Sequence, residues 1–206
     1  IINEISQFFV SIIKIMINHH PESLAIAVTG HRYIPNYDRL YQSIRGIFIS
    51  IIDTHRDHTF TFICPLAEGS DQLAARIALD LKEFKLHVPL PLPVDKYLQD
   101  FNSEDGQDTF QQLLSVAAKI HQLPPKKSRR EAYRALGQYL IHNSDILFAV
   151  WNGVFNKQIG GTSDVVRMAV EAGKTVYWVY CPNQKPGEAN NLEGQKQIGD
   201  LDILSP

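Results

Sequence analysis

The segment LAIAVTGHR at residues 24–32 decides the fold. Its first five residues form an uninterrupted apolar run, which predicts a strand that is covered on both faces of its sheet. Gly30 comes almost immediately after the run, followed by His31 and Arg32, so the strand ends in a turn that carries polar side chains. The segment therefore predicts a parallel sheet with polar groups at the carboxyl ends of its strands.

Four more short apolar runs follow, and helix-like segments separate them. Together with the first, the runs lie at residues 24–28, 60–64, 86–90, 146–150 and 175–180. The helix-like segments lie at about residues 37–54, 70–83, 109–121, 129–141 and 163–172. Alternating strands and helices predict right-handed crossovers and a three-layer α/β sandwich around a parallel sheet. We expect the strand order 3-2-1-4-5, which is common in doubly wound sheets.

Composition narrows the class of protein. The 206 residues are 44% hydrophobic and 20% charged, which predicts one folded domain with a buried core rather than a disordered chain. The net charge of −2 gives no sign of a nucleic-acid or membrane partner. Two cysteines cannot build a disulfide framework, so we expect a reducing, cytoplasmic setting.

The two ends of the chain differ from its middle. Residues 1–20 predict an amphipathic helix that is too short and too polar to span a membrane. We expect this helix to pack on the domain or on a second copy of it, in a homo-oligomer. We expect residues 21–182 to form the main domain, and residues 183–206 predict a loose polar tail. The chain starts without Met, which leaves room for an upstream or partner effector domain.

Prolines alternate around the end of the third run, at Pro89, Pro91 and Pro93. Proline has no N–H group for a sheet, so we expect strand pairing to stop there. Residues 94–106, which follow, are rich in acidic side chains and predict a surface loop or flap over the strand ends.

The loop after the first strand offers donors from Thr29, His31 and Arg32 around Gly30. A glycine directly after a buried strand lets a ligand approach the backbone, and an arginine suits bidentate contact with phosphate. The alternative is an ordinary turn whose histidine and arginine face water.

The loop after the second strand contains Glu68, Gly69, Ser70 and Asp71. Ser70 suits the N-cap of the following helix, and Asp71 lies in its first turn, where the helix dipole favours a carboxylate. Capping alone would account for Asp71. Glu68 lies outside the helix and is therefore a candidate for binding or catalysis.

The loop after the fourth strand begins at Trp151 and leads to Gly160, Gly161 and Thr162, which open a helix. Such glycines leave backbone N–H groups free for an anion at the positive end of the helix. Trp151 could flank a base, and Thr162 could add a hydroxyl. Asp164 either accepts from a ribose hydroxyl or is merely a first-turn acid.

In the expected strand order these three loops meet. Strand one lies between strands two and four, so a crevice opens between strands one and four and is flanked by the loop after strand two. This convergence of remote segments is the main reason to expect a binding site.

The motifs, in order, are Thr-Gly-His-Arg at residues 29–32, Leu-Ala-Glu-Gly-Ser-Asp-Gln at 66–72, Pro-Leu-Pro at 89–91, Trp-Asn-Gly at 151–153 and Gly-Gly-Thr-Ser-Asp at 160–164. This series resembles the SLOG superfamily over residues 22–180. That Rossmann-like group contains the LOG and lysine decarboxylase-like phosphoribohydrolases, the DNA-processing protein DprA and nucleotide-sensing domains of bacterial defence systems. The resemblance implies a nucleotide or nucleotide-derived ligand, with phosphate on residues 160–162. It implies the following pocket residues: Thr29, Gly30, Arg32, Glu68 and Asp71.

The chain departs from the catalytic members of that group. Those enzymes carry Pro-Gly-Gly-x-Gly-Thr-x-x-Glu, whose Glu assists N-glycosidic cleavage, and here Val165 stands where that Glu is expected. A hydrolase that cleaves the N-glycosidic bond of a nucleotide is therefore an alternative, with Glu68 and Asp164 as candidate catalytic carboxylates.

The main hypothesis is a nucleotide-binding sensor or regulatory module. A further alternative is DprA-like nucleic-acid binding through the basic cluster at residues 126–134, which could instead contact a ligand's phosphates. The near-neutral net charge argues against nucleic acid.

His55 and His58 have metal-like spacing, but no third ligand stands near them in sequence, so we expect neither a metal nor a cofactor.

Overall fold

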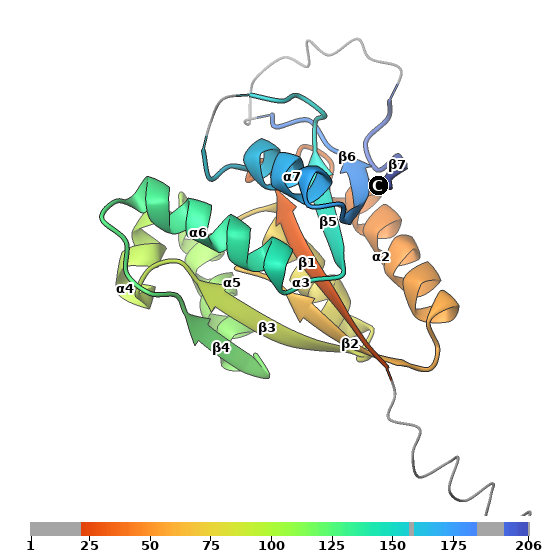
Figure 1. The fold of residues 1–206 in the computed structure, drawn as a ribbon, viewed down its shortest axis with the longest axis horizontal. Helices are drawn as coiled ribbons and strands as arrows, with labels where there is room; N and C mark the ends of the chain where they lie inside the picture. Colours follow the sequence, from red (N-terminus) through yellow and green to blue (C-terminus); the bar gives the residue numbers. More distant parts are fainter. Residues whose placement is uncertain (1–21, 157–158, 185–195, 206) are drawn as a thin grey trace, which may run out of the picture.

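The computed structural model describes residues 22–156, 159–184 and 196–205. It is a Rossmann-like α/β fold whose sheet has the strand order β4-β3-β2-β1-β5-β6-β7 (Figure 1). All neighbouring strands are parallel except β6 and β7, which are antiparallel. The strands are β1 (Glu22–Gly30), β2 (His58–Ile63), β3 (Phe84–Leu90), β4 (Lys119–Gln122), β5 (Ile146–Trp151), β6 (Thr175–Tyr180) and β7 (Leu201–Leu204). The five predicted strands are β3, β2, β1, β5 and β6, and they lie in the predicted order.

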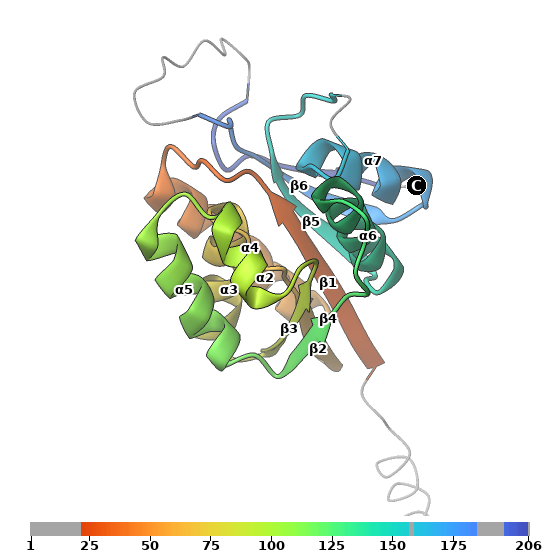
Figure 2. The ribbon, with the colours of Figure 1, turned by 90° about the vertical axis from the view of Figure 1, so that its left-hand side faces the viewer.

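Helices cover both faces of the sheet, which confirms the three-layer arrangement. Helices α2, α3 and α5 lie on one face, and α6 and α7 lie on the other (Figure 2). Their bounds are α2 (Tyr37–Thr54), α3 (Ser70–Asp80), α5 (Glu104–Ser115), α6 (Arg129–His142) and α7 (Thr162–Glu171).

The central strand β1 contributes to two cores at once. Ile26 and Val28 point into the core beneath α2 and α3, and Ala27 points into the core beneath α6 and α7. All three side chains are fully buried. Burial on both faces is the physical reason why this strand is an unbroken apolar run rather than an alternating one.

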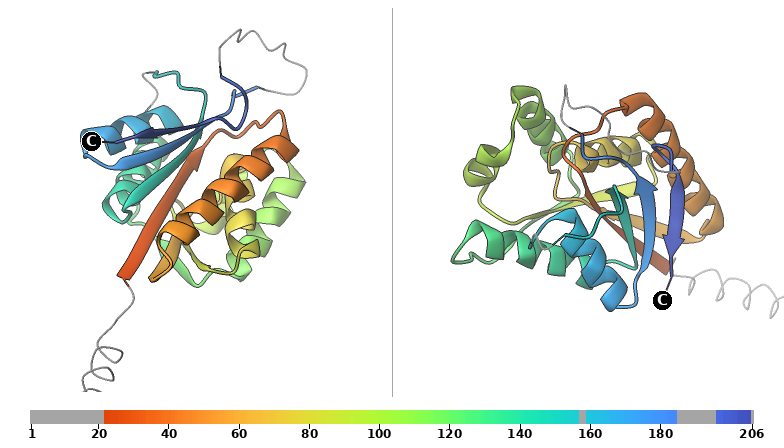
Figure 3. Two further views of the ribbon diagram at one scale, coloured as in Figure 1. Left: turned by 90° about the vertical axis from the view of Figure 1, so that its right-hand side faces the viewer. Right: turned by 90° about the horizontal axis from the view of Figure 1, so that it is seen from above.

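Two strands were not predicted, and both lie at an edge of the sheet. The predicted helix over residues 109–121 is wrong at both ends, because α5 starts earlier and residues 119–122 form β4. Ser103 sets the earlier start, since its side chain accepts a hydrogen bond from the N–H of Gly106 (3.0 Å). Residues 201–204, expected in a loose tail, form β7 beside β6 (Figure 3). Both strands are short and partly exposed, so neither produces an apolar run.

The prolines stop strand pairing on one side only. Pairing between β3 and β2 ends at His87, before Pro89, as expected. Pairing between β3 and β4 continues through Leu90, with Pro89 opposite His121. The predicted flap is also more regular than expected, because it contains α4 (Val94–Tyr97), the short 3-10 helix η1 (Leu98–Asp100) and the start of α5.

No helix within the described residues has the length and apolar character needed to cross a bilayer. The amphipathic helix predicted over residues 1–20 lies outside the described residues.

Candidate functional site

A cavity of about 750 Å³ opens at the carboxyl ends of β1, β2 and β5. All three predicted loops contribute to its wall. The predicted binding residues that line it are Thr29, Gly30, His31, Arg32, Asp71, Trp151, Gly160, Gly161 and Thr162. Glu68, Gly69 and Asp164 are not among its lining residues. The cavity lies where the strand order reverses around β1, which is the usual position of a ligand in such sheets.

His31 fixes the loop after β1 to both of its neighbours. Its N–H donates to the carbonyl of Val150 (3.0 Å), and its Nε2 accepts the N–H of Asn152 (3.1 Å). Burial lowers the pKa of His31, so the ring is neutral at pH 7, with its proton on Nδ1. Its carbonyl oxygen accepts from the N–H (3.0 Å) and the hydroxyl (2.7 Å) of Ser70. The loop is therefore held between β5 and α3.

Two glycines, Gly30 and Gly69, allow the loops after β1 and β2 to approach each other closely. The N-cap of α3 is Gly69 rather than the predicted Ser70, whose hydroxyl is used by His31 instead. Gly69 has φ 94°, and a Cβ there would lie 2.1 Å from the carbonyl oxygen of Arg32. A Cβ on Gly30 would lie 2.6 Å from the Cβ of Ser70. Both positions exclude a side chain, so the loops after β1 and β2 form one packed unit.

We expect Gly69→Ala to lower the free energy of unfolding by at least about 2 kcal/mol, because it combines a left-handed backbone with a clash against main chain. The matched control is Gly46→Ala in α2, where an added Cβ meets nothing within 4 Å. That change should raise stability by about 0.5–1 kcal/mol. Urea unfolding measures both. Equal effects of the two changes would show that the contact between Gly69 and Arg32 does not constrain the fold.

The start of α7 presents free backbone donors to the cavity. Its N-cap is Gly161, which has no side chain to cap the helix. Within the described residues, the N–H groups of Thr162 and Ser163 donate no hydrogen bond. Both residues line the cavity. Unpaired N–H groups at the positive end of a helix form a site for an anion.

Asp164 stabilises the turn at the start of α7. Its side chain is 1% exposed, and its Oδ2 accepts the N–H of Gly160 (2.9 Å). Its other oxygen pairs with Arg167. The carboxylate thus stabilises the turn that exposes the backbone donors, and it does not line the cavity.

Two arginines give the cavity a positive charge. Arg32 comes from the loop after β1, and Arg130 comes from the first turn of α6. Among the described lining residues, Asp71 is the one carboxyl group. Burial raises the pKa of Asp71 to about 8, although the backbone N–H of Ala67 and the charge of Arg32 oppose the shift. At pH 7 Asp71 is therefore mainly neutral, and the cavity favours an anionic ligand.

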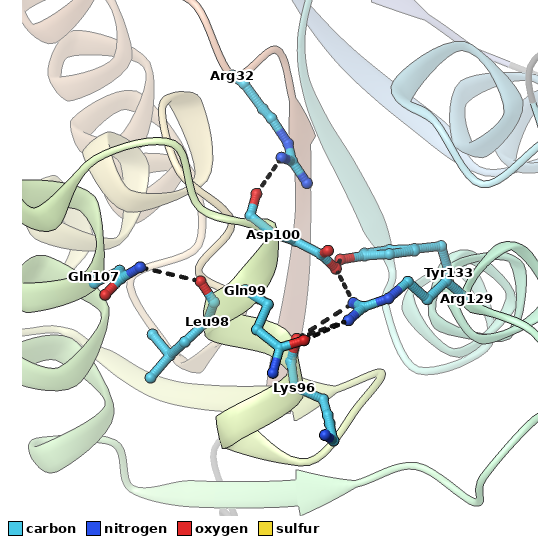
Figure 4. Close-up of polar contacts among 8 residues, drawn as sticks. All are labelled: Arg32, Lys96, Leu98, Gln99, Asp100, Gln107, Arg129 and Tyr133. Atoms are coloured by element: carbon cyan, nitrogen blue, oxygen red, sulfur yellow. Dashed lines mark hydrogen bonds and ion pairs between the residues drawn. The ribbon is translucent and has the colours of Figure 1, made fainter.

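Asp100 links the wall of the cavity to the segment after β3 (Figure 4). Its carboxylate accepts from Arg129 (2.6 Å) and from the hydroxyl of Tyr133 (2.5 Å). Its carbonyl oxygen accepts from the guanidinium of Arg32 (2.5 Å). These contacts hold η1 against α6 and orient two residues that line the cavity, Arg32 and Tyr133.

Tyr97 brings a second buried polar group to the wall. Asp71 is 3% exposed and Tyr97 is 1% exposed, and both line the cavity. Neither Oδ1 of Asp71 nor the hydroxyl of Tyr97 has a hydrogen-bond partner among the described residues. Buried polar atoms are nearly always paired, so these two atoms are candidates for hydrogen bonds with a ligand.

Glu68 has a structural contact rather than a place in the cavity wall. Its carboxylate accepts from the N–H of Asn102 (2.7 Å), from the side-chain amide of the same residue (3.1 Å) and from the hydroxyl of Ser103 (2.5 Å). It thereby anchors the segment that leads into α5.

Trp151 lines the cavity but is only 2% exposed. Its ring packs against Phe155 and Trp178, with ring centroids 4.8 and 5.6 Å apart. The ring therefore mainly supports the cavity wall.

Sequence reasoning missed several residues that line the cavity, among them Tyr97, Arg130, Tyr133 and Ser163. Arg130 belongs to the basic cluster at residues 126–134, and contact with a ligand's phosphates was one interpretation of that cluster. Tyr97 lies in the segment predicted to form a flap over the strand ends, but the sequence does not indicate that this side chain lines the cavity.

Among the described residues, no group of three or more His, Cys, Asp or Glu side chains could hold a metal ion. Comparison with protein-family models and with curated proteins finds no match for this chain.

Proposed function

We propose that this chain binds a nucleotide or nucleotide-derived ligand, with its phosphate at the start of α7. The observation that carries the proposal is the chemistry of the residues that line the cavity. Thr162 and Ser163, with their free N–H groups, line the same cavity as Arg32 and Arg130. The carboxyl group among the described lining residues, Asp71, is mainly neutral at pH 7. A phosphate would find both charge and hydrogen-bond donors there.

The size and position of the cavity support a small-molecule ligand. Its volume of about 750 Å³ falls within the range of about 300–1,000 Å³ that is common for such sites. Its place beyond the carboxyl ends of β1 and β5 is the one that Rossmann-like sheets use for ligands.

We also infer a distant relationship to the SLOG superfamily and a sensor or regulatory role. Support comes from the positions of the motifs. The stretches at residues 29–32, 66–72, 89–91 and 160–164 lie at the carboxyl ends of strands, in the loops that follow them, or in the first turn of the next helix.

The alternative functions have less support. Glu68 and Asp164 are engaged in structural contacts, and the apolar Val165 lines the cavity where the catalytic Glu of phosphoribohydrolases would stand. N-glycosidic hydrolysis therefore stays a prediction without a specific contact in its favour. Nucleic-acid binding through the basic cluster also has less support, because two of its arginines are used within the domain. Arg129 pairs with Asp100, and Arg130 lines the cavity.

A thermal-shift panel tests the proposal. Nucleoside monophosphates should raise the melting temperature, and the matching nucleosides should raise it far less, because the phosphate supplies the main contact. A ligand at 100 times its Kd stabilises the folded state by about 2.7 kcal/mol. Arg130→Ala should reduce this stabilisation, and Lys126→Ala, an exposed neighbour outside the cavity, should leave it unchanged. Equal shifts with nucleosides and monophosphates would contradict the phosphate site.

A further inference from the structure

Two residues that line the cavity each carry a buried polar atom without a partner among the described residues, Oδ1 of Asp71 and the hydroxyl of Tyr97. They come from different elements, since Asp71 lies in the first turn of α3 and Tyr97 ends α4. Arg32 lies close enough to influence the pKa of both groups. The two groups therefore form one polar pair on the cavity wall.

The order of the strands places this pair away from the start of α7, where the phosphate is proposed to bind. Asp71 follows β2 and Tyr97 follows β3, on one side of β1, whereas the start of α7 follows β5 on the other side. A ligand whose phosphate lies at the start of α7 would have to extend across the end of β1 to reach Asp71 and Tyr97. The pair would therefore contact a part of such a ligand other than its phosphate.

The chemistry of the pair favours a hydroxyl group. A tyrosine hydroxyl donates and accepts, and a neutral carboxyl does the same, so both suit a group that can do both. The ring of Tyr97 packs edge-on against Phe101 and Phe110, with ring centroids 5.4 and 5.6 Å apart. Tyr133 packs against it at 6.2 Å. Other aromatic rings thus cover the ring of Tyr97, which disfavours stacking with a base and leaves its unpaired hydroxyl as the group that can bind a ligand.

We propose that Asp71 and Tyr97 form a sugar subsite that binds the ribose hydroxyls of the ligand and so selects ribose over a sugar that lacks them. This inference rests on the proposed function and adds to it the class of sugar. Oδ1 of Asp71 and the hydroxyl of Tyr97 each gain the partner that they lack in the free protein. A ligand without those hydroxyls leaves both atoms buried and unpaired.

The subsite is tested with two ligands, a ribonucleoside monophosphate and its 2′,3′-dideoxy analogue. Both carry the base that gives the largest thermal shift. Titration calorimetry of the wild-type chain should show at least about tenfold weaker binding of the dideoxy form. Tyr97→Phe removes only an unpaired hydroxyl, so the fold should be kept, and the ratio of the two affinities should fall towards one. Tyr139→Phe is the control, because its hydroxyl lies near His87 (3.3 Å) and not in the cavity wall; it should keep the wild-type ratio.

The outcomes separate the two proposals. If monophosphates bind but the ribose and dideoxy forms bind equally to the wild-type chain, the sugar subsite is wrong and the phosphate site stands. The subsite is also wrong if Tyr97→Phe keeps the wild-type ratio. If no monophosphate binds at all, both proposals fail.

Discussion

Gly161→Asp should weaken binding of nucleoside monophosphates by about 100-fold or more, and it should make the free protein slightly more stable. Gly161 is the N-cap of α7, with φ −93° and ψ 175°, which any residue adopts. An aspartate there would accept from the N–H groups that the phosphate needs, and it would repel the phosphate. Each lost charge-assisted hydrogen bond costs about 1.5–3 kcal/mol, which accounts for the expected loss. The new cap should stabilise the free protein by a few tenths to about 1 kcal/mol.

The opposite signs of these two effects make the test specific. A variant that merely damages the fold would lose binding and stability together. Gly161→Asn is the matched control, because it caps the helix without a charge and should weaken binding less than the aspartate does. Calorimetry gives the affinities, and thermal unfolding without ligand gives the stabilities. Unchanged affinity in Gly161→Asp would mean that the start of α7 does not bind the phosphate.

Asp71→Asn should make the stability of the protein much less dependent on pH. Burial raises the pKa of Asp71 in the folded protein to about 8, above its ordinary value of 3.8. Between these values the folded state keeps a proton that the unfolded chain has lost. The stability linked to this carboxyl is therefore complete below pH 3.8 and is lost as the pH rises through 8. A difference of this size corresponds to on the order of 5 kcal/mol.

The asparagine keeps a similar shape and carries no charge at either pH. The variant should thus gain stability relative to the wild-type chain as the pH rises from 4 to 8, by several kcal/mol at the upper end. Urea unfolding across this pH range measures the gain. Asp57→Asn serves as the control, because that side chain faces solvent, and its curve should run parallel to that of the wild-type chain. A parallel curve for Asp71→Asn as well would show that the buried carboxyl is not neutral in the folded protein.

Sequence reasoning predicted the central part of the sheet because burial on both faces leaves a clear pattern. The run at residues 24–28 is apolar throughout, since alternate side chains enter two different cores. The edge strands β4 and β7 lack that signal, because at least half of their residues are exposed. Their pairing depends on the neighbouring strand, and a single sequence does not show that.

The candidate site was predicted by topology rather than by any one motif. Three loops at the ends of parallel strands had to meet once the strand order was known, and they do. The roles of single carboxylates were less predictable. Asp71, which a capping role alone would account for, lies in the cavity wall, whereas Glu68, which looked free, is held by Asn102 and Ser103. The sequence predicts a flap over the strand ends after β3, but it does not show which groups of that segment contact Glu68.

Amide NMR of the ¹⁵N-labelled chain, titrated with a nucleoside monophosphate, observes the proposed phosphate contact at its own atoms. The N–H signals of Thr162 and Ser163 should move most, and inorganic phosphate alone should move the same two signals in the same direction at higher concentration. Signals of residues 30–32 should follow when the whole nucleotide binds. If the nucleotide binds while the signals of Thr162 and Ser163 stay in place, the phosphate lies elsewhere and the proposed function of this cavity is wrong.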